Sequence, residues 1–112
     1  MRVLVCGGRD FKDWQLLHAE LDNLKPPATH IIHGTARGAD KLASDWAQSR
    51  NIPETRFRAE WEIFGRAAGP LRNQKMLMEG KPDLVVAFPG SAGTADMVRR
   101  AKAAGVRVIE LT

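Results

Sequence analysis

The stretch Arg2-Val-Leu-Val-Cys-Gly-Gly-Arg-Asp10 decides the fold of this chain. Its short apolar run is rich in β-branched side chains and predicts a buried strand over Arg2–Cys6, and the glycine pair that follows ends that strand in a tight turn. Everything after this turn repeats the same plan, a strand followed by a helix. The first strand therefore sets the pattern for the chain.

Working outward, helical spacing of apolar residues begins after Asp13, a good N-cap, and Pro26 and Pro27 stop this first helix. Further helices are expected over residues 39–47, 70–79 with Gly80 as C′ residue, and 93–104, and further strands over residues 29–33, 54–59, 83–88 and 106–111. Residues 61–68 are compatible with either a loop or a first helical piece. Alternating strands and helices with right-handed crossovers predict an α/β fold: a single Rossmann-like domain over residues 1–112, whose doubly wound parallel sheet of about five strands has the order 3-2-1-4-5 and helices on both faces.

Composition narrows the function classes. The chain has 112 residues, enough for one domain, and its hydrophobic fraction of 44% excludes a disordered chain. Its apolar runs fall short of the roughly 20 residues of a membrane-spanning helix and of a signal peptide. One cysteine, Cys6, cannot form an internal disulfide and is expected to be a small buried hydrophobe, as in a cytoplasmic protein. The net charge of +4 favours anionic ligands in general.

Three glycine-rich loops follow the strands that lie in the middle of this predicted sheet. Since ligands of doubly wound sheets bind at the carboxyl ends of the strands, near the switch point, these loops are expected to converge on one site. Glycine allows close approach of the backbone, and the helix starts that follow two of the loops attract phosphate. The candidate ligand-binding residues of the loops are Gly7, Gly8, Arg9, Gly34, Arg37, Gly38, Asp40, Pro89, Gly90, Ser91, Ala92, Gly93 and Thr94.

The first loop lacks the dinucleotide-binding pattern Gly-x-Gly-x-x-Gly, and no stretch matches the P-loop pattern Gly-x-x-x-x-Gly-Lys-Ser/Thr. The absence of both patterns speaks against dinucleotide hydride transfer and P-loop chemistry. Three arginines are candidates for gripping phosphate. Arg9 has the alternative of an ion pair with Asp10 or Asp13, and Arg37 has the same two interpretations at the mouth of a helix. Arg72 is expected in the first turn of a helix, where a positive charge opposes the helix dipole, so ligand contact is favoured.

Several other side chains have two interpretations. Asp40 is equally suited to bind ribose hydroxyls and to cap a helix, and Thr94 is suited both to phosphate and to an N-cap. Trp61 suits stacking on a base or packing under a loop, whereas Trp14 and Trp46 are expected in the core.

Two histidines on one predicted strand raise the question of a metal. His30 and His33 are three apart, so a strand points them to opposite faces, and no shared metal ion is expected. Contact of His33 with a ligand is the less favoured of its interpretations. No resident cofactor is predicted.

The stretch Pro89-Gly90-Ser91-Ala92-Gly93-Thr94 resembles the Pro-Gly-Gly-x-Gly-Thr motif of the SLOG superfamily. That group contains the LONELY GUY phosphoribohydrolases and the DprA/Smf proteins. The segments that resemble its small YspA-like, YpsA-related branch, found in bacteria and phages, are Gly7-Gly8-Arg9-Asp10-Phe11, Gly38-Ala39-Asp40, Trp46-Ala47 and Ala68-Gly69-Pro70-x-Arg72-Asn73-x-x-Met76. The resemblance covers almost the whole chain. It implies a Rossmann-like fold, a pocket for a nucleotide-derived ligand to which Asn73 belongs, and a homo-oligomer.

The hydrolases of this superfamily pair an arginine, followed by lysine, with a glutamate three positions after the motif threonine. Arg72 stands at the arginine position, but the glutamate position falls on Met97, with Asp96 one place earlier. Methionine cannot stabilise oxocarbenium-like charge or activate water. The resemblance therefore implies Arg72 with Asp96 or Glu79 as the only catalytic candidates, and hydrolysis is in doubt.

Three functions follow in order of preference. The first is binding of a nucleotide or nucleotide-derived (ribose-phosphate) small molecule, as a sensor or ligand-capture domain. The alternative is N-glycosidic hydrolysis of nucleoside monophosphates. The third is association with DNA, by analogy to DprA. A nucleic-acid partner is not favoured, and no membrane partner is expected.

Overall fold

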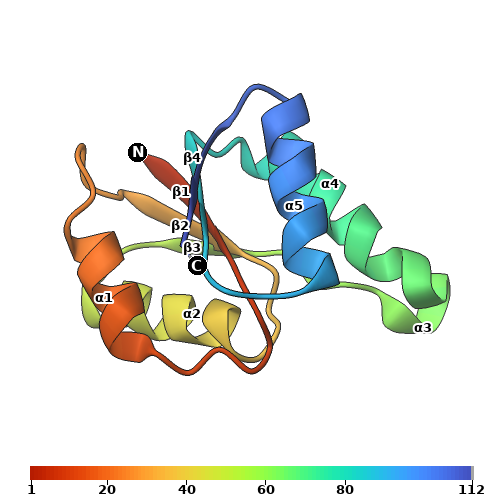
Figure 1. Ribbon diagram of the computed structural model, residues 1–112, viewed down its shortest axis with the longest axis horizontal. Helices are drawn as coiled ribbons and strands as arrows, with labels where there is room; N and C mark the ends of the chain where they lie inside the picture. The colour runs from red at the N-terminus through yellow and green to blue at the C-terminus, as the bar shows by residue number, and fades with distance from the viewer. Residues whose placement is uncertain (112) are drawn as a thin grey trace.

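The computed structural model describes residues 1–111 and contains a five-stranded parallel sheet of order β3-β2-β1-β4-β5 (Figure 1). The strands are β1 Arg2–Cys6, β2 His30–His33, β3 Glu54–Arg56, β4 Leu84–Ala87 and β5 Arg107–Glu110. The predicted α/β class and strand order are thus confirmed. The chain adds β2 and β3 on one side of β1 and then β4 and β5 on the other side. The switch point therefore lies between β1 and β4, where the sequence predicted it.

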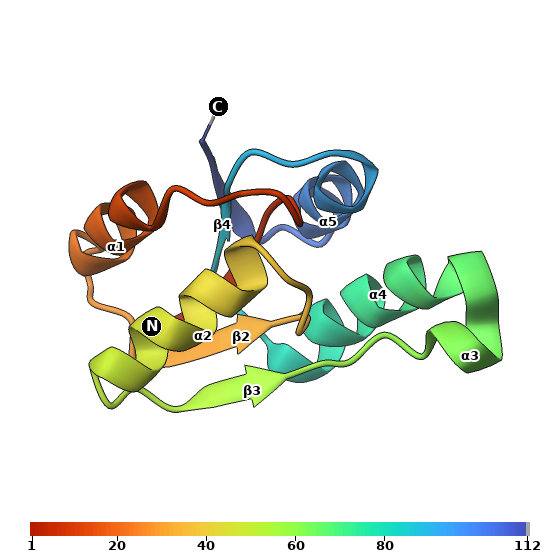
Figure 2. The ribbon, with the colours of Figure 1, turned by 90° about the horizontal axis from the view of Figure 1, so that it is seen from below.

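Helices cover both faces of the sheet. One face carries α1 (Trp14–Asp22) and α2 (Ala39–Ser49), and the other carries α4 (Ala68–Gly80) and α5 (Ala92–Ala103). Figure 2 shows the two pairs on opposite sides, with the short α3 (Trp61–Phe64) at the far end of α4. A single 3-10 turn, Gly65–Ala67, connects α3 to α4. The helices thus leave the carboxyl ends of the strands bordered by loops.

The alternation of β1 explains the two layers. Val3 and Val5 point into the cluster formed with α1 and α2, while Leu4 and Cys6 point into the cluster formed with α4 and α5. All four side chains are buried, because successive residues of a strand face opposite sides of the sheet. Fully buried central strands of this kind are typical of parallel sheets.

Several element boundaries differ from those predicted. Helix α1 ends at Asp22, ahead of the prolines, and β3 ends at Arg56. Helix α4 starts at Ala68, so Arg72 lies in its second turn rather than its first. The left-handed residue after this helix is Lys81, with a φ of 51°, and not Gly80.

Gly80 has a packing role instead. A Cβ at this position would lie 3.2 Å from Cγ2 of Ile32, so its absence lets the end of α4 press against β2. Gly80 is thus the last residue of α4, and the left-handed conformation that ends the helix falls on Lys81.

The two tryptophans expected in the core, Trp14 and Trp46, differ in their exposure to solvent. Trp46 is 2% exposed, whereas Trp14 is 53% exposed and packs edge-on against His18 on the surface. The prediction for Trp14 is wrong: Leu17 and Leu21 carry the buried face of α1, and Trp14 lies outside that cluster. Over residues 1–111, none of the helices has the length and hydropathy needed to cross a membrane.

The three glycine loops pack directly against one another. Gly8 donates its N–H to the carbonyl oxygen of Pro89 (2.9 Å) and accepts a bond from the N–H of Ala39 (3.2 Å). Gly38 has a φ of 78°, and a Cβ there would overlap the Gly8 carbonyl oxygen. The ends of β1, β2 and β4 are therefore joined backbone to backbone.

Gly38→Ala is expected to destabilise the protein more than Gly105→Ala. Both glycines have positive φ values, 78° and 76°, but the Cβ space at Gly105 is open while that at Gly38 is occupied. Backbone strain alone costs on the order of 1 kcal/mol, and the added collision should raise the cost at Gly38 to roughly 3 kcal/mol. Urea denaturation of both variants measures the difference, and equal losses of unfolding free energy would show that the loops are not tightly packed.

Candidate functional site

A groove of about 880 Å³ runs along the carboxyl edge of the sheet. The candidate residues that line it are Gly7, Gly8, Arg9, Arg37, Asp40, Arg72, Asn73, Pro89, Gly90, Ser91, Ala92, Gly93 and Thr94. The structure therefore brings together all predicted ligand-binding residues except Gly34 and Gly38. The loops after β1 and β4, the loop before α2 and the start of α4 form its walls.

A second hollow of about 330 Å³ adjoins the groove. We call it the arginine pocket, because its lining includes Arg9, Arg37, Arg58 and Arg72. The predicted residue Gly34 lines this pocket. The residues shared by the pocket and the groove are Arg9, Ala36, Arg37, Trp61 and Arg72.

Most of the predicted glycines make room for protein atoms rather than for a ligand. A Cβ on Gly7 would lie 2.6 Å from Cβ of Ala39, and one on Gly90 would collide with the hydroxyl of Thr94. Only at Gly93, among the candidates, is the space that a Cβ would take open. Gly93 is thus the position at which an approaching ligand group finds room.

Helix α5 begins beside this space. Its N-cap is Ser91, which makes no side-chain capping bond, and Thr94 is the third helical residue rather than the cap. The N–H groups of a first helical turn have no partner within the helix and carry its positive dipole end. Residues 91–94, which carry or flank these N–H groups, line the groove.

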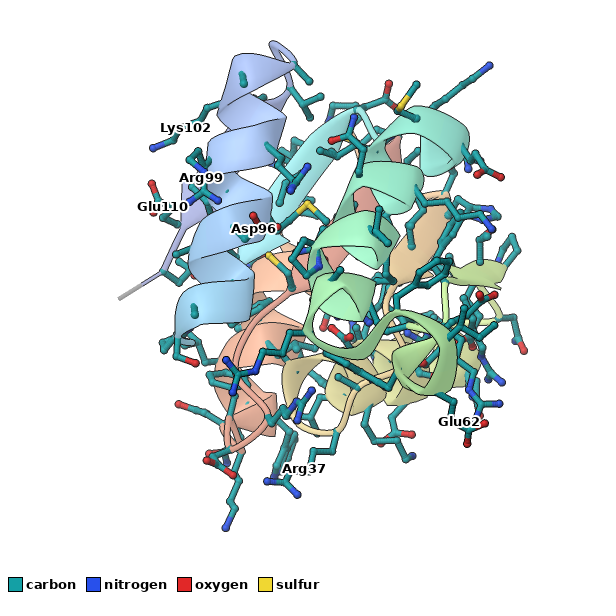
Figure 3. The ribbon with its side chains drawn as sticks, turned by 90° about the vertical axis from the view of Figure 1, so that its right-hand side faces the viewer. Arg37, Glu62, Asp96, Arg99, Lys102 and Glu110 are labelled. Carbon is teal, nitrogen blue, oxygen red and sulfur yellow. The ribbon has the colours of Figure 1, made fainter. Side chains whose placement is uncertain are left out.

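Asn73 and Asp96 tie α4 to this turn. Nδ2 of Asn73 donates to the carbonyl oxygen of Gly93 (3.2 Å) and to Oδ2 of Asp96 (3.0 Å). Asp96 also accepts bonds from Arg99 (2.6 Å) and from Nε of Arg100 (2.8 Å). Figure 3 shows Asp96 on the side of α5 that faces α4, with Arg99 beside it. Each of its two carboxylate oxygens therefore already accepts at least one bond from a protein donor.

These contacts set the basicity of Asp96. Burial raises the pKa of this carboxyl, but the hydrogen bonds from Asn73 and Arg100 and the two nearby guanidinium charges outweigh burial, so that the pKa lies below its ordinary value of 3.8. A carboxylate held in this way is a weak base and a poor nucleophile.

Met97 does not face the groove. Its side chain is 0% exposed and packs in the apolar cluster with Leu4 and Met76. The neighbouring Asp96 lines the groove instead, about 100° further round the helix. A glutamate at position 97, where the hydrolases have one, would therefore be buried in the core of this protein. Glu79 is exposed and lines neither hollow.

Arg72 lies at the junction of the two hollows. Its Nη1 donates to the carbonyl oxygen of Gly34 (2.6 Å) and its Nε to Oδ1 of Asn73 (3.2 Å). Burial lowers the pKa of this guanidinium, Asp40 raises it, and the positive charge of Arg9 lowers it further. The cation is thus held in place by neutral acceptors.

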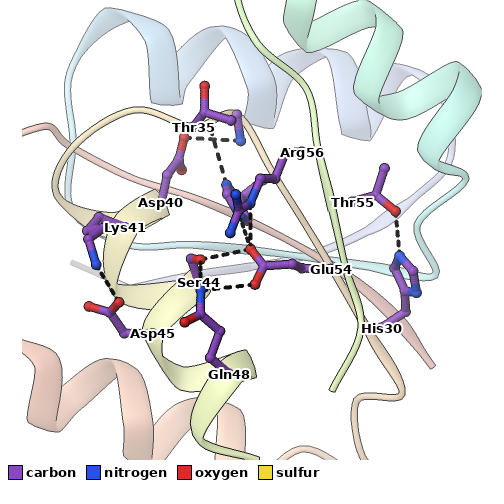
Figure 4. Close-up of polar contacts among 12 residues, drawn as sticks. His30, Thr35, Asp40, Lys41, Ser44, Asp45, Gln48, Glu54, Thr55 and Arg56 are labelled. Carbon is purple, nitrogen blue, oxygen red and sulfur yellow. Dashed lines mark hydrogen bonds and ion pairs between the residues drawn. The ribbon is translucent and has the colours of Figure 1, made fainter. Parts of the chain in front are cut away.

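Asp40 has a role that differs from both interpretations offered by the sequence. Its Oδ2 accepts the N–H groups of Gly34 and Ala36, each at 3.1 Å. The carboxyl group is buried, and burial raises its pKa while the bond from Ala36 lowers it. Asp40 thereby holds the loop between β2 and α2 from inside, and Figure 4 shows it beside that loop.

Thr35, in this loop, has a left-handed backbone with a φ of 63°. This conformation is costly for a β-branched residue. Its N–H donates to Nδ1 of His33 (3.1 Å), whose Nε2 lies 2.8 Å from Oε1 of Glu54. His33 is 3% exposed and lines neither hollow, and His30 bonds Thr55 instead, so the two histidines have separate partners.

Glu54 hydrogen-bonds several side chains behind the loop between β2 and α2. Besides His33, it accepts bonds from Ser44 (2.8 Å) and Arg56 (3.0 Å), as Figure 4 shows. Burial alone would raise the pKa of Glu54, but these bonds together lower it from 4.5 to about 2. The charged carboxylate therefore supports the loop that forms one wall of the arginine pocket.

Two wall residues go beyond the sequence prediction. Arg58 follows β3, after which no glycine-rich loop marks the carboxyl end, and Arg66 lines the groove from the turn before α4. Trp61 packs on Gly69, where a Cβ would lie 3.2 Å from its ring, and the guanidinium of Arg9 lies 5.5 Å from the ring centroid. Within residues 1–111, Arg9 forms neither ion pair proposed for it.

Fold and site together define a Rossmann-like α/β protein whose candidate site lies at the carboxyl edge of its sheet. The model of the YspA, cpYpsA-related SLOG family matches residues 1–64, and the chain belongs to this family. The Gene 61 protein of Mycobacterium phage D29 is 40% identical over 119 residues, which cover 96% of this chain and 94% of the phage protein. The family named from the motifs is confirmed.

The X-ray structure of DNA processing protein A (DprA) from Streptococcus pneumoniae shares the fold. The TM-score is 0.56 with 16% sequence identity, and the alignment covers 96% of this chain. The chain spans 58% of the length of that DprA chain. At this identity the likeness extends to the fold alone.

The acid sensitivity of the protein should depend on Glu54. Since its pKa is about 2 folded and about 4.5 unfolded, its stabilising effect is present above pH 4.5 and is lost as the pH falls toward 2. We expect Glu54→Gln to reduce the loss of unfolding free energy over this interval by at most about 3 kcal/mol. Chemical denaturation at several pH values measures this loss.

Asp45→Asn is the control, because Asp45 is a surface carboxylate on α2 paired only with Lys41. It should leave the acid profile near that of the wild type. Identical acid profiles for Glu54→Gln and the wild type would contradict the assigned network.

Proposed function

We propose that the groove binds a nucleotide or a nucleotide-derived small molecule, with a phosphate group at the start of α5. The observation that supports this most strongly is the open space at Gly93 beside the uncapped first turn of a helix. Such a turn is a ready site for phosphate. Membership of the SLOG family supports the same class of ligand.

The remaining walls suit the other parts of such a ligand. Trp61 is 46% exposed and lines both hollows, and an aromatic ring of this kind suits stacking of a base. Arg9 and Arg72 add positive charge, and Arg72 is partly buried, where a charge-assisted bond to phosphate is stronger than in water. We place Arg37 at the outer rim, because its side chain is 75% exposed.

Binding without turnover is the preferred role, as a sensor or a capture domain. An N-glycosidic hydrolase needs a carboxylate that is free to stabilise positive charge or to activate water. Asp96 is the candidate in the groove, and Asn73, Arg99 and Arg100 already occupy it. Cytoplasmic location and homo-oligomer formation remain predictions of the resemblance and the composition.

Identification of the ligand comes first. Protein purified from its natural host and then denatured should release a phosphate-bearing nucleotide derivative, detected by mass spectrometry. Strong, steeply salt-dependent binding of DNA in place of such a ligand would favour the nucleic-acid alternative.

Gly93→Val is expected to weaken binding of adenosine 5′-monophosphate at least tenfold. The added side chain fills the open space without meeting protein atoms, so the fold should persist. Isothermal titration calorimetry measures affinity and circular dichroism the fold. The control is Ala103→Val, an exposed change at the other end of α5. A folded Gly93→Val variant with the affinity of the wild type would refute a phosphate site at this turn.

The wild-type protein should release adenine from adenosine 5′-monophosphate no faster than buffer does. The only carboxylates lining the groove besides Asp96, within residues 1–111, are Asp10, Asp13 and Asp40. Asp40 is bound to the loop backbone, Asp13 caps α1 by accepting the N–H of Leu16, and the side chain of Asp10 is 93% exposed. Chromatographic detection of enzyme-dependent adenine would contradict the binding role, and its loss in Asp96→Asn would then assign the activity to Asp96.

A further inference from the structure

The arginine pocket differs from the groove in charge. Its lining contains four arginines and, within residues 1–111, no carboxylate. The groove lining, in contrast, contains four aspartates as well as basic residues. A concave site with charge of one sign concentrates its electrostatic potential, so the pocket is the more strongly anion-attracting of the two hollows.

Few of these positive charges are paired within the protein, although the buried Asp40 raises the pKa of Arg72 without forming an ion pair with it. Within the part of the chain that the structure describes, Arg9, Arg58 and Arg72 take part in no ion pair. Arg37 has one contact of 3.5 Å, with the exposed Asp10. Like charges that converge on one hollow repel each other, and a bound anion would remove this repulsion.

Two of the guanidinium groups are held in position before any ligand arrives. Arg72 is bonded to the carbonyl oxygen of Gly34 at 2.6 Å, and Arg9 lies over the ring of Trp61. The pocket wall between them contains Thr35, whose left-handed backbone is kept by His33 and, through the flanking residues, by Asp40. A planar guanidinium held in this way can bind two oxygens of one phosphate group.

We propose that the arginine pocket is a second anion site and takes a second phosphate group of the same ligand. This inference rests on the proposed function of the groove. Arg9, Arg72 and Trp61 line both hollows, so one molecule can reach from the start of α5 into the pocket. The ligand class is then a nucleotide derivative with two phosphate groups at separate positions on its sugar.

Arg58 provides the test, because it lines the pocket and not the groove. By calorimetry at constant salt, the wild type should bind adenosine 3′,5′-bisphosphate at least tenfold more tightly than adenosine 5′-monophosphate. Arg58→Ala should remove most of this preference and leave the affinity for the monophosphate within twofold. Arg107→Ala makes the same charge change at the exposed start of β5, away from both hollows, and should alter neither affinity.

Equal affinity of the wild type for the two nucleotides would overturn the second site while leaving the groove proposal intact. So would an equal loss for both nucleotides in Arg58→Ala. If the wild type bound neither nucleotide, the proposed function would fail, and inorganic pyrophosphate would decide the pocket by itself. Pyrophosphate binding that survives in Gly93→Val and is lost in Arg58→Ala supports the pocket. Absence of that binding, or insensitivity to Arg58→Ala, overturns it.

Discussion

The contact between three backbone segments, at Gly8, Gly38 and Pro89-Gly90, is the constraint on which the rest of the site depends. Gly8 bonds Pro89 at 2.9 Å, and the positions of Gly38 and Gly90 leave no room for a Cβ. This contact brings the ends of three parallel strands to one place. The groove lies over that place because the loops, once packed, expose the first turn of α5 and the side chains that border it.

The polar groups behind the loops keep cationic side chains in position without neutralising them. The carboxylate of Asp40 accepts hydrogen bonds from backbone N–H groups, and the carboxylate of Glu54 is bonded to His33, Ser44 and Arg56. The arginines that face the hollows bond to neutral acceptors or lie on Trp61. A net positive surface is thus preserved at the site, and its natural complement is a phosphate-bearing ligand.

Much of the fold followed from the sequence, because the central strands β1, β2 and β4 are short buried runs and each is followed within three residues by glycine. The convergence of the three loops followed from the strand order. The differences have local causes: the sequence predicts a strand over residues 54–59, which contains Arg58, whereas β3 ends at Arg56 and Arg58 lies beyond its carboxyl end. Asp96 and Met97 lie about 100° apart on α5, and which of them faces the groove depends on how α5 packs against the sheet, where Met97 joins the cluster with Leu4. Trp14 fits an apolar helical stripe, yet it is 53% exposed and contacts His18, while Phe11 packs against the core ahead of the helix.

The most direct test of a phosphate-bearing ligand at this edge is a ¹H–¹⁵N correlation spectrum of the protein during titration with adenosine 3′,5′-bisphosphate. The account predicts that the amide signals that shift belong to the loop after β1, the loop before α2 and the first turn of α5, with Gly93 among the largest changes. Amides on the opposite edge of the sheet, such as that of Arg107, should stay in place. An unchanged spectrum at millimolar ligand, or shifts confined to surfaces away from the carboxyl edge, would contradict it.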